Sequence, residues 1–349
     1  MKFILLLIFF SINICSTNME RMSFNHQNEY REYLIYKPNN FNNLEKVNLL
    51  IGFHGYSGTA SAFESEVTGG LNQLADKYNF LAIYPQGKYF YDFKTYNSKT
   101  FISSFNDLTG SNGKTADGEI CDVDADPYPK YPECGEAGRC AWQSCSDDIG
   151  FIKSLIDDLK KSYKIENIYL VGNSNGGMFV TAFACKHPEL LTAILSVNGM
   201  QAKDLSCTPD LPVNAILYGS YYDTGVTPVN IRSEDGYFYE PLENTINSWK
   251  QKFQCNSKKK LAYSFNEDYV EETYFDCKND KKVISVLNLD AEHMWPEFGY
   301  IKETNQSIYF PNGYCATKIQ SYLGYELCDK QNEIEMTDFF ISKLLSFRN

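Results

Sequence analysis

The chain has 349 residues, of which 43% are hydrophobic, and these include 24 Phe and 26 Tyr. This supply of apolar side chains is enough to build a large core and excludes a disordered chain. The formal net charge of −12 disfavours nucleic acids and anionic membrane surfaces as partners, because phosphate binding needs concentrated Lys and Arg.

The first residues have the pattern of a signal peptide. Lys2 precedes a mainly apolar run from 3 to 14, and polar residues follow at 16–18. The run is shorter than the ~20 apolar residues of a membrane-spanning helix, and no later segment approaches that length. A buried N-terminal strand is the alternative. We expect residues 1–17 to be a signal peptide, 18–349 to form one domain, and the protein to be secreted.

Ten cysteines remain if Cys15 leaves with the signal peptide. An even number of cysteines in an exported chain indicates disulfides. None of the ten forms a Cys-x-x-Cys pair and the chain has only four histidines, so a zinc cluster is a poor competitor. The acidic segment 122–126 imitates a calcium loop, but Pro127 stands where such a loop needs glycine. We therefore expect no metal and no cofactor.

The first predicted elements alternate between strand and helix. Residues 30–38 have the alternating pattern of an antiparallel strand, and the apolar run 47–53 predicts a strand buried on both faces. Apolar residues at helical spacing then predict a helix at about 62–77, and a strand follows at 80–84. Strand, helix and strand in this order indicate a parallel sheet.

Residues 88–145 interrupt this rhythm. They are rich in Tyr, Phe, Asp, Gly and Pro, hold four cysteines and show no sustained period. We interpret them as a disulfide-pinned insertion over the active face of the sheet. Its rings either stack on a substrate or fold on one another, and they include Tyr89, Phe90, Tyr91, Phe93, Tyr96, Phe101, Phe105 and Trp142.

The second half of the chain returns to alternating strands and helices. A helix is predicted from 147 to about 163, where Asp147 and Asp148 cap its first turn rather than act as catalysts. A strand at 168–171 leads through a glycine-rich turn into a helix that ends near 186. Further strands at 193–197, 213–218 and 283–289, with helices near 244–253 and 333–346, complete a predicted three-layer α/β sandwich.

The strongest motif is Gly-Asn-Ser-Asn-Gly at 172–176. A Gly-x-Ser-x-Gly pattern between a strand and a helix is typical of a nucleophile elbow, a tight turn that exposes the serine. Glycines on either side let this strained turn approach the strand and helix that it joins. A phosphate-binding loop is the alternative, but no Lys follows as in a P-loop. Ser174 is therefore the predicted nucleophile.

A serine hydroxyl needs a base beside it and a carboxylate that orients the base. His26 lies before the first core strand, His54 ends an early strand, and His187 ends the helix that starts at the elbow. His293 lies in the loop after the last predicted strand, where the order serine, acid, histidine requires the base. We predict His293 as the base and a structural role for His54.

The acid should follow a strand between the serine and the base. Asp223 follows the predicted strand 213–218, whereas Asp204, Asp210 and Asp235 are less well placed. An aspartate that only stabilises a turn is the alternative at this position. Asp223 is the predicted acid.

An oxyanion formed at Ser174 needs two backbone N–H donors. Asn175, at the start of the helix after the elbow, supplies one of them. The second comes from the loop after the strand 47–53, and we predict that it is the N–H of Tyr56.

Several segments match a known pattern over about residues 30 to 346, namely FHGYSGTA (53–60), IYPQG (83–87), DDIGFIKSLIDDL (147–159), GNSNGGM (172–178), ACKHPEL (184–190) and HMWP (293–296). They resemble the secreted esterase family that includes feruloyl esterases of carbohydrate esterase family one and polyhydroxybutyrate depolymerases. The resemblance implies an α/β-hydrolase fold, a triad of Ser174, Asp223 and His293, and a disulfide between Cys255 and Cys277. The segments 88–145 and 304–330 are enlarged relative to this pattern.

The resemblance also implies a serine carboxylic-ester hydrolase with an acyl-enzyme mechanism. We expect a monomeric feruloyl esterase whose ester substrate is attached to a plant polysaccharide, with Trp142 and Trp295 as substrate contacts. A polyhydroxybutyrate depolymerase and an acetylxylan esterase are alternatives. A catalytically silent carbohydrate-binding relative is the alternative from outside the enzymes.

Overall fold

The computed structural model describes residues 19–63, 71–93, 100–264, 268–296 and 336–348, together with three short strands between residues 307 and 327. The predicted signal peptide and, apart from these strands, the enlarged segment 304–330 lie outside the described residues. Residues 64–70, in the middle of the helix predicted at 62–77, also lie outside the described residues. On either side of them the structure has the short helices α1 (Ala60–Ala62) and α2 (Leu71–Tyr78).

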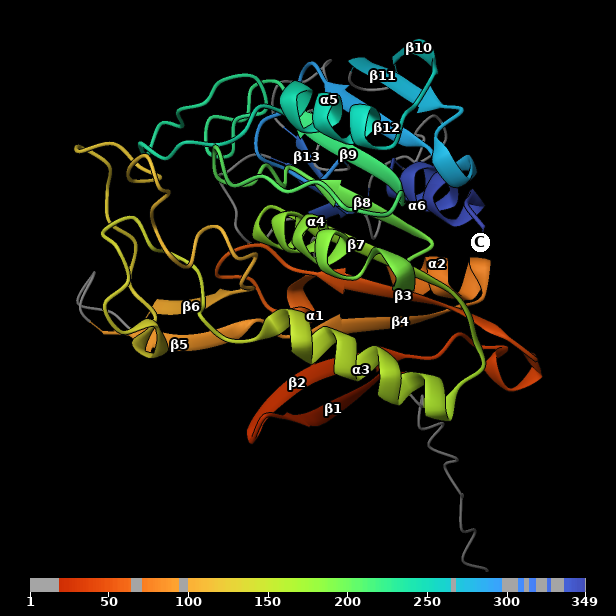
Figure 1. Cartoon of the computed structure of the whole chain (residues 1–349). Coiled ribbons are helices and arrows are strands. Elements are labelled where there is room, and N and C mark those ends of the chain that lie inside the picture. The colour runs from red at the N-terminus through yellow and green to blue at the C-terminus, as the bar shows by residue number, and fades with distance from the viewer. Residues whose placement is uncertain are drawn as a thin grey trace, which may run out of the picture.

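A ten-stranded sheet runs through the centre of the molecule (Figure 1), in the order β1-β2-β4-β3-β7-β8-β9-β12-β11-β10. From β4 to β12 the neighbours are parallel, whereas the strands at both edges pair antiparallel. The bounds are β1 (Met19–His26), β2 (Glu29–Tyr36), β3 (Val47–Phe53), β4 (Phe80–Pro85), β7 (Ile165–Asn173), β8 (Ala193–Val197), β9 (Asn214–Ser220), β10 (Ser257–Ser264), β11 (Asp268–Phe275) and β12 (Val283–Asn288).

Helices cover both faces of this sheet, and side chains alternate between the two cores. In β3, Leu49 and Ile51 enter one core and Leu50 enters the other, because successive residues of a strand point to opposite faces. The first core lies under α3 (Asp148–Ser162), α4 (Asn175–Lys186) and α5 (Leu242–Lys252), and the second lies under α2 and α6 (Met336–Ser346). The predicted three-layer sandwich with a mostly parallel sheet is confirmed.

Strand β1 was not predicted from the sequence. It pairs antiparallel with β2 along its whole length, from Met19 opposite Tyr36 to His26 opposite Glu29. Most of its side chains are partly or fully exposed, because it is an edge strand. Its mixed polar sequence therefore carries no buried-strand pattern, and the pairing depends on backbone hydrogen bonds to a neighbour.

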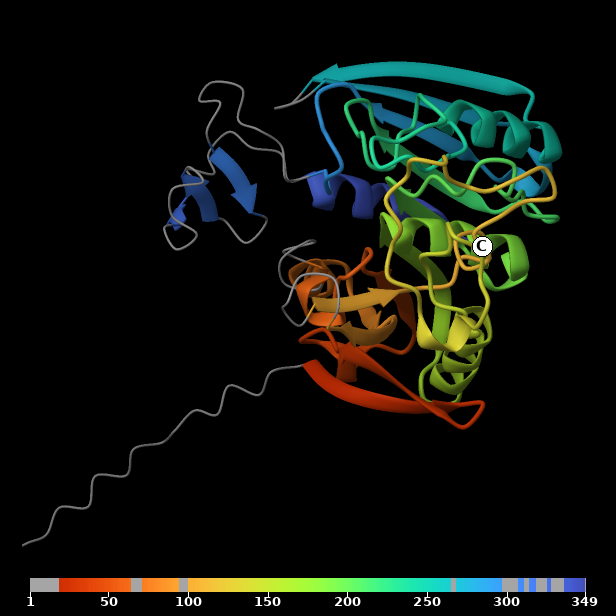
Figure 2. The same ribbon diagram turned by 90° about the vertical axis from the view of Figure 1, so that its left-hand side faces the viewer.

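The insertion begins as a hairpin and continues as a cross-linked loop. β5 (Lys88–Asp92) pairs antiparallel with β6 (Thr100–Ser104), and this hairpin was also not predicted. In Figure 2 the following loop, in yellow, crosses the edge of the sheet where the parallel strands end. Within it, Cys121 pairs with Cys140 and Cys134 with Cys145. Outside it, the structure pairs Cys185 with Cys207, and Cys255 with Cys277 as the resemblance implied.

Three further strands, β13 (Ser307–Phe310), β14 (Tyr314–Thr317) and β15 (Tyr325–Leu327), form a small antiparallel sheet. In the described part of the chain, no helix is both long enough and apolar enough to cross a membrane.

Candidate active site

The turn between β7 and α4 has the geometry of a nucleophile elbow. Ser174 lies in it with φ 55° and ψ −123°, a conformation that L-residues adopt only under strain. The flanking glycines leave no room for a side chain: a Cβ on Gly172 would lie 2.3 Å from the backbone carbon of Gly176, and one on Gly176 would lie 2.1 Å from the carbonyl oxygen of Phe53. The motif therefore follows from close packing of the elbow against β3.

The structure brings the three predicted triad side chains together. The Nε2 of His293 lies 2.9 Å from the Oγ of Ser174, and the Nδ1 of His293 lies 2.6 Å from the Oδ2 of Asp223. The other carboxylate oxygen of Asp223 accepts from the N–H groups of Gly225 (3.0 Å) and Val226 (2.7 Å). This buried carboxylate is thus held by its own loop while it faces the imidazole.

Two neighbouring strands deliver the acid and the base to the same edge of the sheet. Asp223 follows β9 and His293 follows β12, and these two strands pair in parallel. Backbone hydrogen bonds join the two loops, since the N–H of Tyr222 donates to the carbonyl of Ala291 (3.0 Å) and that of Tyr221 to the carbonyl of Asn288 (2.8 Å). The spacing of Asp223 and His293 is therefore set by paired backbone rather than by the side chains alone.

The loop after β3 approaches the elbow closely. A Cβ on Gly55 would lie 3.2 Å from the Cβ of Ser174. The carbonyl of Gly55 accepts from the N–H of Gly58 (3.1 Å) and contacts Nδ1 of His54 (2.7 Å). In a trans peptide the next N–H points away from that carbonyl. The N–H of Tyr56 is thereby directed away from His54.

His54 is buried and holds this loop to the start of the insertion. Because a carbonyl can only accept, Nδ1 carries the proton and donates to Gly55. Nε2 then accepts from the N–H of Gly87 (3.0 Å) and from the side-chain amide of Gln86 (3.1 Å). Burial lowers the pKa of His54 to about 4, and the hydrogen bond to the carbonyl of Gly55 opposes this only in part. The imidazole is neutral at pH 7.

Gln86 was not singled out by the sequence reasoning, although it lies in the IYPQG segment. Its side-chain oxygen accepts from the N–H of Ala60 at 3.0 Å, and its amide nitrogen reaches Nε2 of His54. This one side chain joins α1 to the imidazole that orients the loop at Gly55.

The side chain of Asn175 attaches the insertion to the elbow. Its Oδ1 accepts from the N–H of Phe105 (2.7 Å), and its Nδ2 donates to the carbonyl of the same residue (2.9 Å). Nearby, the N–H of Ser57 donates to the carbonyl of Ser103 (2.8 Å). The sequence predicts a role only for the backbone N–H of Asn175, because no local pattern connects residue 175 with a partner 70 residues away.

The structure does not support the expectation that Trp142 and Trp295 contact the substrate, because both side chains are buried. Trp142 is 7% exposed and packs against Tyr56, and Trp295 is 2% exposed and donates from Nε1 to the hydroxyl of Thr337 (2.6 Å). Both indoles are largely covered by the protein itself. Exposed rings occur instead on the hairpin β5–β6 and at Tyr221 and Tyr222, beside Asp223.

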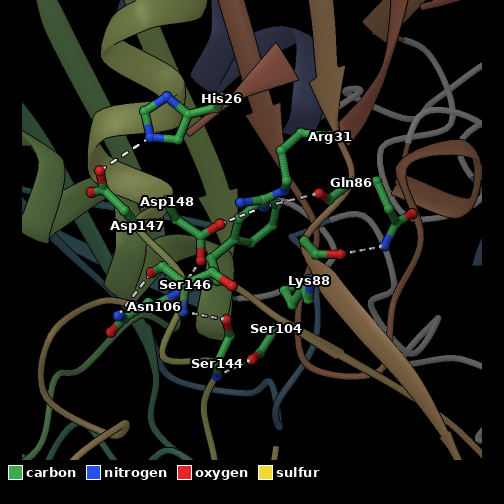
Figure 3. Close-up of polar contacts among 12 residues, drawn as sticks. His26, Arg31, Gln86, Lys88, Ser104, Asn106, Ser144, Ser146, Asp147 and Asp148 are labelled. Atoms are coloured by element: carbon green, nitrogen blue, oxygen red, sulfur yellow. Dashed lines mark hydrogen bonds and ion pairs between the residues drawn. The ribbon is translucent and has the colours of Figure 1, made fainter. Parts of the chain in front are cut away.

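The two aspartates at the start of α3 have structural partners, but only Asp147 caps the helix. Asp147 accepts from the N–H of Gly150 (2.9 Å) and caps the helix, and it also contacts the ring of His26 (3.1 Å) (Figure 3). Asp148 is buried, where it pairs with Arg31 and accepts from the N–H of Asn106 (2.7 Å).

Two aspartates of the acidic segment 122–126 form ion pairs with an arginine side chain. Asp122 and Asp124 pair with Arg232 at 3.1 and 2.9 Å. Among the described residues, no group of three or more His, Cys, Asp or Glu side chains is arranged to hold a metal ion.

Comparisons with known proteins agree with the fold. A protein-family model described as alpha/beta hydrolase fold matches residues 131–222. The solved structure of an acetyl xylan esterase from Aspergillus awamori is similar with a TM-score of 0.50 and 15% identity, over 79% of this chain and 95% of that one. The chain thus has the α/β-hydrolase fold.

Two further solved structures are more distant. An S-formylglutathione hydrolase from Agrobacterium tumefaciens has a TM-score of 0.46 and 10% identity, over 79% of this chain and 88% of that one. A ferulic acid esterase has a TM-score of 0.32 and 14% identity, over 52% of this chain and 59% of that one. No curated protein sequence matches the chain.

Proposed function

We propose that the protein is a serine carboxylic-ester hydrolase that works through an acyl-enzyme. The observation that carries this proposal is the hydrogen-bonded series from Ser174 through His293 to Asp223 at a strained elbow of an α/β-hydrolase fold. A strained serine with a histidine at 2.9 Å and a buried carboxylate behind it is the arrangement that activates a hydroxyl for acyl transfer.

In the first half-reaction Ser174 Oγ attacks the ester carbonyl carbon while His293 Nε2 takes the hydroxyl proton. The tetrahedral intermediate collapses, the alcohol leaves with the proton from His293, and the acyl group stays on Ser174. Water then attacks the acyl-enzyme with His293 again as the base, and the acid is released. Asp223 keeps Nδ1 of His293 protonated and stabilises the imidazolium.

The negative oxygen of each intermediate is stabilised by the N–H groups of Tyr56 and Asn175. Asn175 begins α4, where the first N–H groups of the helix have no partner inside the helix. The Tyr56 peptide is oriented by the bonds that hold the carbonyl of Gly55. Each such donor contributes about 3 kcal/mol to the transition state.

We propose a feruloyl ester on a plant polysaccharide as the substrate. The segments that resemble feruloyl esterases support this, as do the exposed rings of Tyr221 and Tyr222 beside Asp223, which can stack on an aromatic acyl group. An acetyl ester on xylan is the second candidate, because the acetyl xylan esterase from Aspergillus awamori shares the fold over most of both chains.

We further propose that the protein is secreted and acts as a monomer of one domain. The four disulfides among the described residues support export, because such bonds persist in oxidising compartments. The signal-peptide pattern at 1–17 supports it independently.

The test compares hydrolysis of methyl ferulate, acetylated xylan and a hydroxybutyrate oligomer by the disulfide-intact protein. Ser174→Ala should abolish the activity, whereas Ser342→Ala, on the surface of α6, should not change it. An organophosphonate should label the parent protein and not Ser174→Ala. A folded protein that cleaves none of the esters and resists labelling would support the silent carbohydrate-binding relative instead.

A further inference from the structure

One face of the hairpin β5–β6 carries three aromatic rings. Tyr91 pairs with Phe101 across the hairpin, and Tyr89, two residues before Tyr91, points to the same face. The ring centroids of Tyr89 and Tyr91 lie 5.3 and 5.5 Å from that of Phe101. Phe90 points to the other face and packs against Tyr131 at 5.0 Å. The hairpin thus has a more buried inner face and an aromatic outer face.

The outer rings are accessible to a ligand. Tyr89 is 42% exposed and Tyr91 is 44% exposed, in contrast to the buried Trp142 of the same insertion. Exposed rings gathered on one surface, rather than scattered singly, are a feature of interaction sites.

These rings form one wall of a hollow whose other lining residues are partly polar and partly apolar. This hollow of about 190 Å³ lies between them and Arg21, Glu32 and Thr59 of β1, β2 and the start of α1. A second hollow of about 640 Å³ lies next to it, since Glu32, Gln86 and Tyr89 line both hollows. We call the two neighbouring hollows together the groove.

The charged side chains of the groove are paired within the protein. Arg21 lies 3.7 Å from Glu32, and Lys88 pairs with Glu29. Figure 3 shows Arg31 extended between the carboxylate of Asp148 and the backbone carbonyl of Gln86, to which it donates at 3.4 Å. The groove therefore combines apolar rings with hydrogen-bonding groups and no excess of either charge, which suits a neutral, hydroxyl-rich ligand and not a polyanion.

One end of the groove lies near the loop that carries the predicted oxyanion donor Tyr56. Thr59, in its wall, follows Tyr56 by three residues, so the two lie within about 10 Å of each other along the chain. The N–H of Ser57 donates to the carbonyl of Ser103 in β6, which fixes the hairpin to the loop at Tyr56.

We propose that this groove binds a neutral polysaccharide segment adjacent to the sugar that carries the ester. The rings of Tyr89, Tyr91 and Phe101 stack on the apolar faces of the sugars, and the opposite wall bonds their hydroxyls. The inference rests on the proposed function, which it deepens: the groove makes the site selective for polymeric over small esters.

Binding can be measured without catalysis in the Ser174→Ala protein. We expect a gel containing soluble neutral xylan to retard this protein, and a gel containing polygalacturonate to leave its mobility unchanged. Adding Tyr89→Ala and Tyr91→Ala should weaken xylan binding at least about fivefold, because the two exposed rings that stack on the sugars are lost. The pair Tyr89→Phe and Tyr91→Phe keeps the rings and should retain binding. The control pair Val123→Ala and Leu211→Ala removes exposed apolar groups elsewhere and should have no effect.

The active protein provides the second arm. Tyr89→Ala with Tyr91→Ala should lower kcat/KM on feruloylated arabinoxylan at least about fivefold and leave it within about twofold on methyl ferulate. Three results would overturn the proposal that the groove binds a neutral polysaccharide: equal retardation by both polymers, no retardation by xylan, or unchanged binding by the folded protein that carries both alanine substitutions. The proposed function fails separately, if the parent protein hydrolyses no ester while Ser174→Ala still binds xylan.

Discussion

The side chain of His54 should control the rate through the loop that it orients. His54→Gln can still offer an oxygen to the N–H of Gly87, but it removes the donor to the carbonyl of Gly55. His54→Asn keeps a donor for the carbonyl of Gly55, since its amide lies near the place of Nδ1. Its shorter side chain does not reach the N–H of Gly87, which loses its acceptor. The two variants separate orientation of the Tyr56 N–H from stability of the loop.

The expected decrease in kcat follows from the hydrogen bonds that each variant loses. Complete loss of one oxyanion donor costs about 3 kcal/mol, or roughly 100-fold in kcat. The N–H of Gly58 still holds the carbonyl of Gly55 at 3.1 Å, so we expect a fall of about 10- to 100-fold for His54→Gln with little change in KM. His54→Asn should stay within about threefold in kcat but unfold more easily, because a buried N–H without an acceptor costs about 1–3 kcal/mol.

The assay is steady-state hydrolysis of a small soluble ester, with thermal unfolding measured on the same samples. Equal losses of kcat in both variants, or a parent-like kcat in folded His54→Gln, would refute the role of this imidazole in orienting the loop. Affinity for a trifluoromethyl ketone, which forms an oxyanion on Ser174, should fall in parallel with kcat for His54→Gln.

The same imidazole should make stability depend on pH. Its pKa is about 4 in the folded protein against 6.5 for an ordinary histidine, so between these values the unfolded chain binds the extra proton. The stabilisation is complete above pH 6.5 and is lost as the pH falls toward 4, by about 3 kcal/mol in all. Unfolding of Ser174→Ala followed from pH 7 to 4.5 should show this loss, and adding His54→Gln should flatten it. Parallel curves for the two proteins would contradict the assignment.

Three further outcomes are expected. Asp223→Asn should lower kcat by about 10⁴-fold with the fold intact, because an amide favours the wrong tautomer of His293, and kcat within tenfold of the parent would exclude Asp223 as the acid. Arg31→Met should cost about 3–5 kcal/mol in urea unfolding, because it leaves the buried carboxylate of Asp148 unpaired, and adding Asp148→Leu should recover part of that loss; a loss that only grows would argue against the pair. Cys255→Ser with Cys277→Ser opens a loop of 22 residues and should lower the free energy of unfolding by about 3 kcal/mol. Ester hydrolysis at 25 °C should persist. Loss of activity in the folded variant would show that this disulfide is coupled to the active site.

Much of the fold could be predicted because its central strands are buried on both faces. The runs 47–53, 80–84 and 168–171 are apolar for that reason, and each lies within a parallel strand. The edge strand β1 and the hairpin β5–β6 lack such a pattern. Their pairing depends on partners rather than on their own burial, and it was missed.

The sequence by itself determined the elbow and the chain order of the site. Glycine is required at 172 and 176, because a Cβ there would lie 2.3 and 2.1 Å from backbone atoms. The motif around Ser174 therefore shows this steric requirement directly. The tertiary structure alone decided which aromatic rings are accessible, since Trp142 and Tyr89 belong to the same ring-rich insertion but only Tyr89 is exposed. The tertiary structure alone also decided the hydrogen bonds between Asn175 and Phe105. Burial and long-range pairing depend on how distant segments pack, and they produce no periodic pattern in either segment.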